Sequence, residues 1–178
     1  MFRKMRRFKQ QIPTEECIEI LRRAKTGVLA LHGDDGYPYA VPLNFAYEEG
    51  GSGLGTIGFH CAKTGHKLDA IRRDEKVCFT VVDRDEVLPR ERTNRFCSVI
   101  VFGRARILED EEALRRAAMA VGNKYCKGYE QDCLEETEDT IRRGTLCCVE
   151  ITIDHMTGKI GRELLMERQN GVKAPGVE

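Results

Sequence analysis

The sequence predicts a mainly β protein, a small antiparallel β-barrel with helices at its ends. Six or so strand-like segments follow one another in meander order, and helical segments are inserted between them. The regular alternation of strand and helix that a parallel sheet requires is missing. No phosphate-binding P-loop motif is present either, which argues further against a nucleotide-binding α/β fold.

Length and charge limit the classes of protein that the chain can represent. At 178 residues it fits one domain, which we expect to span residues 1–165, with a flexible tail over residues 166–178.

Basic and acidic side chains balance at 29 each, which disfavours a general nucleic-acid binder. The basic segment 1–9 is followed by no apolar run, so it predicts a frayed terminus rather than an export signal. No apolar run is long enough to span a membrane, and we expect a cytoplasmic protein that binds neither nucleic acid nor membrane.

The eight cysteines predict thiols rather than a disulfide framework. Most of them lie in apolar or strand-like runs, where cysteine behaves as a small hydrophobe, and without an export signal the thiols are expected to be reduced. His60, Cys61 and His66 lie close in sequence, but adjacent residues of a strand point to opposite faces. No second ligand pair follows at zinc spacing, so no metal site is predicted.

The first elements are a helix and a β-hairpin. An amphipathic helix is predicted over residues 14–25, with the buried stripe Cys17, Ile18, Leu21 and Ala24. Residues 27–32 predict a buried strand. Asp35-Gly36 precedes a new alternating run, which is a strong hairpin signal.

The next strand, residues 37–47, has one large and one small face. The large side chains, expected in the core, are Tyr37, Tyr39, Val41, Leu43, Phe45 and Tyr47. The small face carries Pro38, Ala40, Pro42, Asn44 and Ala46. Pro42 cannot donate to a neighbouring strand, so an incompletely paired edge is predicted. A small-residue face at an open edge fits either a planar ligand or a plain edge strand.

A strand over residues 56–61 leads into a short helix with an unusual charge order. Thr64 is the predicted N-cap, and Leu68 and Ile71 form the apolar stripe. Lys63, His66 and Lys67 crowd the helix start, although that end carries partial positive charge and favours acids. This arrangement predicts either a phosphate site or lysines that simply point into water.

The remaining segments complete the barrel. Residues 76–83 and 95–108 predict strands, joined by a mobile loop over 85–93. The second of these strands is apolar on both faces in its middle, which predicts burial on both sides, and Gly103 predicts a bulge or a bend. Helices are predicted over 110–125 and 131–143, a final strand over 145–154, and a turn-rich segment over 155–161.

Four motifs occur in an order that resembles a known family. They are Gly36-Tyr-Pro-Tyr-Ala-Val-Pro-Leu-Asn-Phe45, Phe59-His-Cys-Ala-Lys-Thr-Gly-His-Lys-Leu-Asp-Ala-Ile71, Val77-Cys-Phe-Thr-Val-Val82 and Ser98-Val-Ile-Val-Phe-Gly-Arg-Ala105. The chain resembles the flavin-binding split barrels related to pyridoxamine 5′-phosphate oxidase, within them the 5-nitroimidazole-resistance branch. The likeness runs from Met5 to about Leu165, and the second motif is its most specific part. The glycine-rich turn over 49–55 is longer than the hairpin usual in that family.

The resemblance implies a six-stranded antiparallel split barrel that forms a homodimer with FMN at the interface. It implies a phosphate position among Lys63, His66 and Lys67, and a ring position near the small-residue face with His60 beside it. The cofactor-binding residues expected on this basis are Pro42, Leu43, Asn44, His60, Ala62, Lys63, His66, Lys67, Ser98 and Val99.

The function expected from the resemblance is that of an FMN-dependent oxidoreductase. Electrons would pass from NAD(P)H to a small organic substrate, for example a nitroaromatic or nitroimidazole compound. His60 is the candidate catalytic residue, as a proton donor, because imidazoles titrate near neutral pH; a structural role for it is the alternative. The alternatives for the whole protein are a flavin carrier or redox sensor without turnover, and a haem-binding split barrel.

Overall fold

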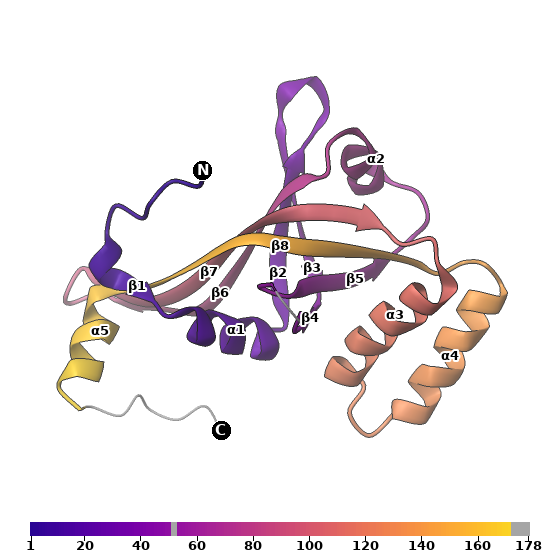
Figure 1. Ribbon diagram of the computed structural model, residues 1–178. Coiled ribbons are helices and arrows are strands. Elements are labelled where there is room, and N and C mark those ends of the chain that lie inside the picture. Colours follow the sequence, from indigo (N-terminus) through magenta and orange to yellow (C-terminus); the bar gives the residue numbers. More distant parts are fainter. Residues whose placement is uncertain (51–52, 172–178) are drawn as a thin grey trace.

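The computed structural model describes residues 1–50 and 53–171, and its strands form one antiparallel sheet (Figure 1). The strands are β1 (Gln11–Ile12), β2 (Thr26–His32), β3 (Pro38–Asn44), β4 (Ala46–Glu48), β5 (Thr56–Cys61), β6 (Lys76–Leu88), β7 (Thr93–Ile107) and β8 (Cys147–Ile160). The helices are α1 (Thr14–Arg23), α2 (His66–Arg73), α3 (Glu111–Tyr125), α4 (Glu130–Arg142) and α5 (Arg162–Gln169). The strand order is β3-β2-β6-β7-β8-β5-β4, and β1 pairs with β8.

A bend at Phe45 makes this sheet a split barrel. Strands β3 and β4 lie at opposite ends of the strand order, yet only Phe45 separates them in the chain, so the sheet must curl back on itself. The Phe45 ring is fully buried, and its backbone N–H donates to the hydroxyl of Tyr125 at 3.2 Å. The predicted mainly β antiparallel split barrel with peripheral helices is therefore confirmed.

The number of strands differs from the expected six. The sheet has eight, because the bend divides the predicted strand 37–47 into β3 and the three-residue β4, and because the two-residue β1 is added at the edge of β8. The alternation predicted for β3 holds from Tyr39 to Asn44, but Tyr37 is exposed, since it lies before the strand begins.

The strands β6, β7 and β8 are longer than the sequence predicts. The loop expected over residues 85–93 is wrong, because β6 continues to Leu88 and pairs with β7 from Thr93 onward. The turn expected over residues 155–161 is also wrong, since β8 continues to Ile160 against β7. Pairing with a long neighbour supplies backbone hydrogen bonds that the polar side chains of these segments do not predict.

One face of the sheet packs the core, and the other leaves apolar side chains exposed. Val99 and Val101 of β7 are fully buried, whereas Ile100 and Phe102 between them are 38% and 39% exposed. Burial on both sides of this strand was predicted and is wrong for a single chain. Val28 and Val82, on neighbouring strands, extend the exposed apolar face. The predicted bulge at Gly103 is confirmed by a register shift between Phe102 and Gly103.

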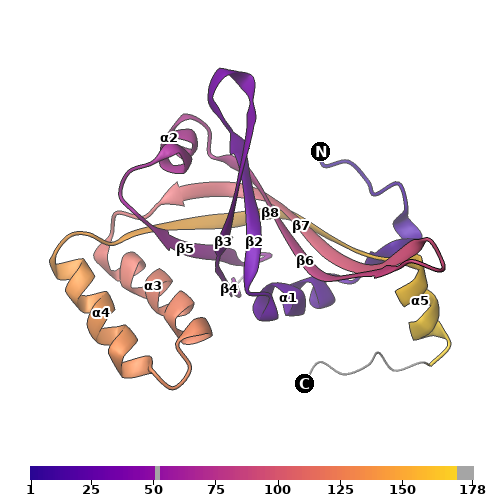
Figure 2. The same cartoon turned by 180° about the vertical axis from the view of Figure 1, so that it is seen from behind.

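The helices lie around the edges of the sheet. The α3–α4 hairpin stands at one end, whereas α5 and the N-terminus stand at the other (Figures 1 and 2). Helix α1 buries Cys17, Ile20 and Leu21, with Ile18 and Ala24 half-buried, and ends at Arg23. The N-cap of α2 is Gly65 and not Thr64, and no side chain bonds to that cap. The first described residues are not frayed, because the Phe2 ring stacks on His155 with the ring centroids 4.5 Å apart.

Parts of the sequence predictions concern residues 51–52 and 172–178, which lie outside the described residues. They include the middle of the glycine-rich turn 49–55 and most of the expected tail 166–178. Helix α5 reaches Gln169 and so extends into that segment. Among the described residues, no helix has the length and apolar character needed to cross a bilayer.

Candidate functional site

A cavity of about 370 Å³ lies between the ends of β3 and β5 and the α3–α4 hairpin. Its lining residues are Asn44, His60, Ala118, Val121, Gly122, Tyr125, Cys126, Cys133, Glu136, Thr137, Thr140 and Leu146. Mostly apolar walls with a few polar groups, at this volume, are typical of small-molecule pockets. Two of the polar groups, Asn44 and His60, are residues that the sequence predicts for a binding site.

Strand alternation brings Asn44 and His60 to this cavity. Both side chains are exposed, on the strand face opposite the buried Phe59 and the half-buried Leu43. The Asn44 side chain donates from Nδ2 to the carbonyl oxygen of Lys25 at 2.9 Å, which fixes its orientation. The His60 ring has no hydrogen bond or ion pair to any residue in 1–50 or 53–171. Both of its nitrogens are therefore available to a ligand.

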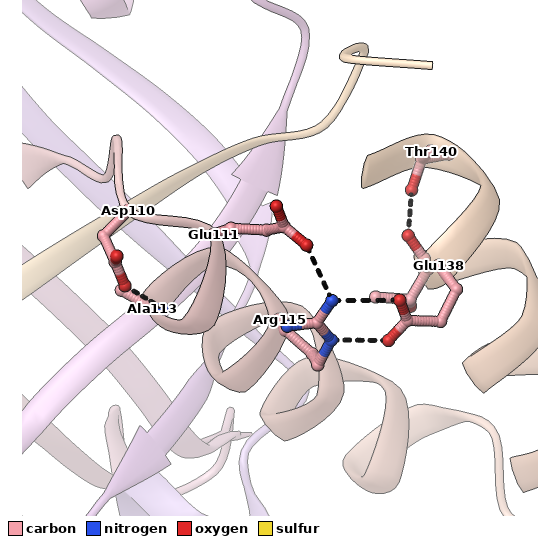
Figure 3. A network of polar contacts seen from close by, with 7 residues as sticks. Asp110, Glu111, Ala113, Arg115, Glu138 and Thr140 are labelled. Atoms are coloured by element: carbon pink, nitrogen blue, oxygen red, sulfur yellow. Dashed lines mark hydrogen bonds and ion pairs between the residues drawn. The ribbon is translucent and has the colours of Figure 1, made fainter. Parts of the chain in front are cut away.

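Arg115 fixes the helical wall of the cavity. This side chain, from α3, bonds Glu138 of α4 through two nitrogens, at 2.5 and 3.0 Å, and also Glu111 at 3.0 Å (Figure 3). Asp110 caps α3 by accepting from the backbone N–H of Ala113 at 2.9 Å. These contacts hold the two helices as one unit over the end of the sheet.

The start of α2 carries the cationic cluster that the sequence predicts. Gly65 has a φ of 141°, a conformation that disfavours a side chain, and it leads into the helix beside Lys63 and Lys67. Lys63 and Lys67 form no ion pair with another described residue. Burial, together with Cys147, raises the pKa of the Cys61 thiol to about 11, and the charge of Lys67 opposes this shift. Lys67 therefore lies near the end of β5.

The third member of that cluster, His66, is engaged elsewhere. Its ring stacks on Tyr39 with the centroids 4.1 Å apart, and its Nε2 lies 3.4 Å from a carboxylate oxygen of Asp34. Asp34 is also paired with Arg73 at 2.7 Å. No local sequence pattern indicates that the β2–β3 turn brings an acidic side chain to this helix. An anion at the start of α2 would meet Lys63 and Lys67 more directly than His66.

Strand β3 connects the cationic end and the cavity. His66 packs on Tyr39 near the start of the strand, whereas Asn44 lines the cavity at its end. Five residues of strand correspond to about 17 Å. Between them Pro42 is exposed on an edge strand, as the sequence predicts, because β3 ends the strand order. The cationic cluster and the cavity thus lie at the two ends of this edge strand, and because Tyr39 and Asn44 are on opposite faces of β3, a ligand that reached both would pass its open edge.

Four other predicted residues lie apart from these groups. Val99 is fully buried in the core, and Leu43 packs against the core from β3. Ser98 lies on β7, paired with Lys159 of β8, and β2 and β6 separate it from β3. Ala62 is exposed in the segment before α2. Within one chain, Ser98 does not join the site.

The helical wall contributes cavity residues that sequence reasoning missed. Tyr125, Cys133, Glu136, Thr137 and Thr140 line the cavity from α3 and α4. Both helices were predicted, but no local pattern indicates where a helical hairpin packs on a sheet.

The fold and the site together define a split barrel whose edge strand joins a cationic helix start to a cavity. The chain belongs to the pyridoxamine 5′-phosphate oxidase family, since residues 13–160 match the model of that family. No curated protein matches the chain.

Several solved structures share the fold. A conserved hypothetical protein from Mycobacterium tuberculosis is 23% identical, with a TM-score of 0.74 and 98% of each chain covered. A candidate 5-nitroimidazole antibiotic resistance protein from Bacteroides thetaiotaomicron is 24% identical, with a TM-score of 0.65 and coverage of 84% of this chain and 86% of that one. An FAD-binding protein from Mesorhizobium loti is 25% identical, with a TM-score of 0.58 and coverage of 85% and 96%.

Proposed function

We propose that this protein binds FMN and acts as an oxidoreductase, passing electrons from a reduced nicotinamide nucleotide to a small organic substrate such as a nitroaromatic compound. The observation that carries the proposal is the convergence of Asn44 and His60 on one cavity at the end of β3, with the cationic start of α2 packed against the other end of the same edge strand. Membership of the family and the FAD named for a structural relative support a flavin cofactor, and the single phosphate site at the start of α2 is the reason for choosing FMN.

The residues of the candidate site fit a flavin mononucleotide. Lys63 and Lys67 are cations without a carboxylate partner in the described chain, beside the amides of a helix start, and this combination suits a phosphate. The exposed face of β3 at Pro42 offers a shelf without large side chains for a planar ring. When bound, the flavin supplies the transfer of hydride or of single electrons, and the protein supplies orientation and electrostatics.

His60 is the protein group best placed to handle a proton in the cavity. Its ring nitrogens have no partner within the described residues, so one of them can hold a proton toward a bound substrate. Asn44 is held by the Lys25 carbonyl and can orient a polar group of the substrate. Ala118, Val121 and Leu146 contribute apolar side chains to the cavity wall.

We further propose that two copies of the chain form a homodimer through the exposed apolar face of the sheet. Val28, Val82, Ile100 and Phe102 lie on this face and are between 38% and 62% exposed. An apolar face in the middle of a sheet is typical of a surface that another protein covers. Ser98 lies on the same side of β7 as Ile100 and would meet the second copy, which gives this predicted site residue a route to flavin.

Flavin loading tests the proposal directly. The Lys67→Ala variant is expected to bind FMN about ten- to a hundredfold more weakly, because one charge-assisted phosphate contact is lost. Arg72→Ala is the matched control, since it removes the same charge from the other end of α2, where Arg72 pairs with Asp69. Equal FMN affinity of the wild type and Lys67→Ala, measured by fluorescence titration, would contradict the phosphate assignment.

Turnover distinguishes the alternatives. The flavin-loaded protein is expected to oxidise a reduced nicotinamide nucleotide in the presence of a nitroaromatic compound, and His60→Ala is expected to lower kcat by about a hundredfold. Flavin binding without oxidation of the nucleotide would indicate a carrier or sensor instead. A Soret band in the protein as isolated would indicate haem.

A further inference from the structure

A cationic groove of about 670 Å³ adjoins the cavity. It is lined by Arg22, Arg23, Lys25, Lys124, Tyr125 and Lys127, without a single acidic side chain. The end of α1, the segment before β2 and the end of α3 contribute these residues, so three elements converge on the groove. Tyr125 lines both the groove and the cavity that contains His60.

The three lysines of this groove carry charge that the chain leaves uncompensated. Arg22 pairs with Glu19 and Glu49, and Arg23 is bound through two nitrogens by Asp83. In contrast, Lys25, Lys124 and Lys127 have no carboxylate at ion-pair distance among residues 1–50 and 53–171.

Lys124 is held in place without a counter-ion. Its Nζ donates to the Leu21 carbonyl oxygen at 3.2 Å and lies 4.0 Å from the centroid of the Phe45 ring. Burial lowers the pKa of Lys124 to about 8, so an anion that approaches Nζ would stabilise its charged form. An oriented ammonium group of this kind is ready to bind an anion.

The groove and the cavity share one wall. Lys25 reaches the cavity through its carbonyl oxygen, which accepts from Asn44 Nδ2 and lies 2.5 Å from the Tyr125 hydroxyl. The start of α2 lies toward the other end of β3, where His66 stacks on Tyr39. A flavin whose phosphate occupies the α2 end would present its ring toward the cavity. An electron donor that reaches that ring through the cavity would then extend its own phosphates into the groove.

We infer that the groove binds the phosphate groups of a nicotinamide adenine dinucleotide donor and favours the 2′-phosphorylated form. This inference rests on the proposed function, because it assigns the donor for the same flavin site. A pyrophosphate carries two negative charges, so it leaves the positive charge of one of the three lysines uncompensated. A 2′-phosphate adds about 1.5 to 2 further negative charges. NADPH therefore matches the groove better than NADH.

Binding of the oxidised nucleotides tests the inference without turnover. The flavin-loaded wild type is expected to bind NADP⁺ at least about tenfold more tightly than NAD⁺ by titration calorimetry. The double variant Lys25→Glu/Lys127→Glu is expected to lose this preference, with unchanged FMN content. Both side chains are exposed, so the fold should tolerate the changes. Lys9→Glu/Lys76→Glu, which reverses two exposed charges outside the groove, is the matched control.

The outcomes separate this inference from the proposed function. Normal flavin loading with equal NADP⁺ affinity in the wild type and the double variant would overturn the groove assignment alone. Inorganic phosphate that competes as strongly as NADP⁺ would show a general anion site and would also overturn it. Lysine-dependent NADP⁺ binding to a protein that takes up no flavin would support the groove and contradict the proposed function.

Discussion

Glu150 illustrates how one buried carboxylate joins three elements. It lies on β8, is 6% exposed, and accepts from Arg106 of β7 at 2.6 and 3.1 Å and from Arg116 of α3 at 3.2 Å. Burial raises the pKa of the neighbouring Glu48, Arg116 opposes this shift, and the charge of Glu150 adds to it. The cluster ties α3, and therefore the wall of the cavity, to the sheet.

Glu150→Gln is expected to lower the free energy of unfolding by about 1–3 kcal/mol, because two arginines lose a charged acceptor in a buried position. Asp139→Asn is the control, since Asp139 also pairs with two arginines but is 43% exposed. Exposed pairs contribute about 0–1 kcal/mol. Urea denaturation of the three proteins measures the difference, and equal losses in the two variants would show that burial of Glu150 adds nothing.

The buried thiols predict a loss of stability at alkaline pH. Burial raises the pKa of Cys17 and Cys148 to about 12 and that of Cys97 to about 11, from 9.0. Because these thiols ionise more readily in the unfolded chain, their contribution to stability is complete below pH 9.0 and falls as the pH rises toward the folded values. Cys148→Ala should therefore show a shallower fall in unfolding free energy between pH 9 and 11, measured under reducing conditions. An unchanged slope would contradict the assignment.

At the scale of residues, the sequence predicted where the cationic side chains lie but not which residues they contact. Lys63 and Lys67 stand at the start of α2 as expected, because helix position follows from local periodicity. The contact between His66 and Asp34 depends on how the β2–β3 turn meets α2, which no local pattern encodes. The cap predicted at Thr64 is wrong, because the helix begins one residue later, after Gly65, whose φ of 141° disfavours a side chain and whose position has no side-chain cap.

At the scale of elements, Gly103 tests how closely the long strands approach. A Cβ on Gly103 would lie 2.3 Å from the carbonyl oxygen of Thr152, a backbone atom that cannot move freely. Gly103→Ala is expected to lower the free energy of unfolding by about 1–3 kcal/mol because of this overlap. Gly58→Ala is the control in β5, where the nearest atom is the Ala117 methyl group at 4.0 Å. Equal stability of the two variants in thermal denaturation would mean that the strands adjust without cost.

The extents of the elements were harder to predict than their types. Helices and strands with regular apolar spacing were predicted within a few residues of their bounds. The ends of β6 and β8 were assigned to loops because Asp85, Glu86 and Gly158 have low strand propensity, and pairing with β7 overrides that preference. The letters Gly-Leu-Gly-Thr-Ile-Gly at 53–58 match a dinucleotide-binding fingerprint, but they lead into β5 rather than from a strand to a helix.

At the scale of the whole molecule, the sequence predicted both ends of the candidate site but not what surrounds them. The alternation of β3 and β5 placed Asn44 and His60 on exposed faces, and the structure brings both to one cavity. The helical wall and the groove beside Tyr125 depend on where the α3–α4 hairpin docks. The apolar pattern of β7 was interpreted as two-sided burial, and a second copy of the chain would supply the missing side.

Charge placed on the exposed apolar face tests that interpretation. Ile100→Asp, in the middle of β7, is expected to raise the dimer dissociation constant at least about a hundredfold, because an unpaired carboxylate would be buried between two copies. Val87→Asp is the control, since Val87 is 68% exposed near the end of the β6–β7 hairpin. Sedimentation velocity measures the subunit number, and FMN titration of the same samples shows whether flavin affinity falls with dissociation, as a site completed by two copies requires. A wild-type protein that sediments as one subunit at micromolar concentration, or an Ile100→Asp variant that remains a dimer, would exclude this face as the interface.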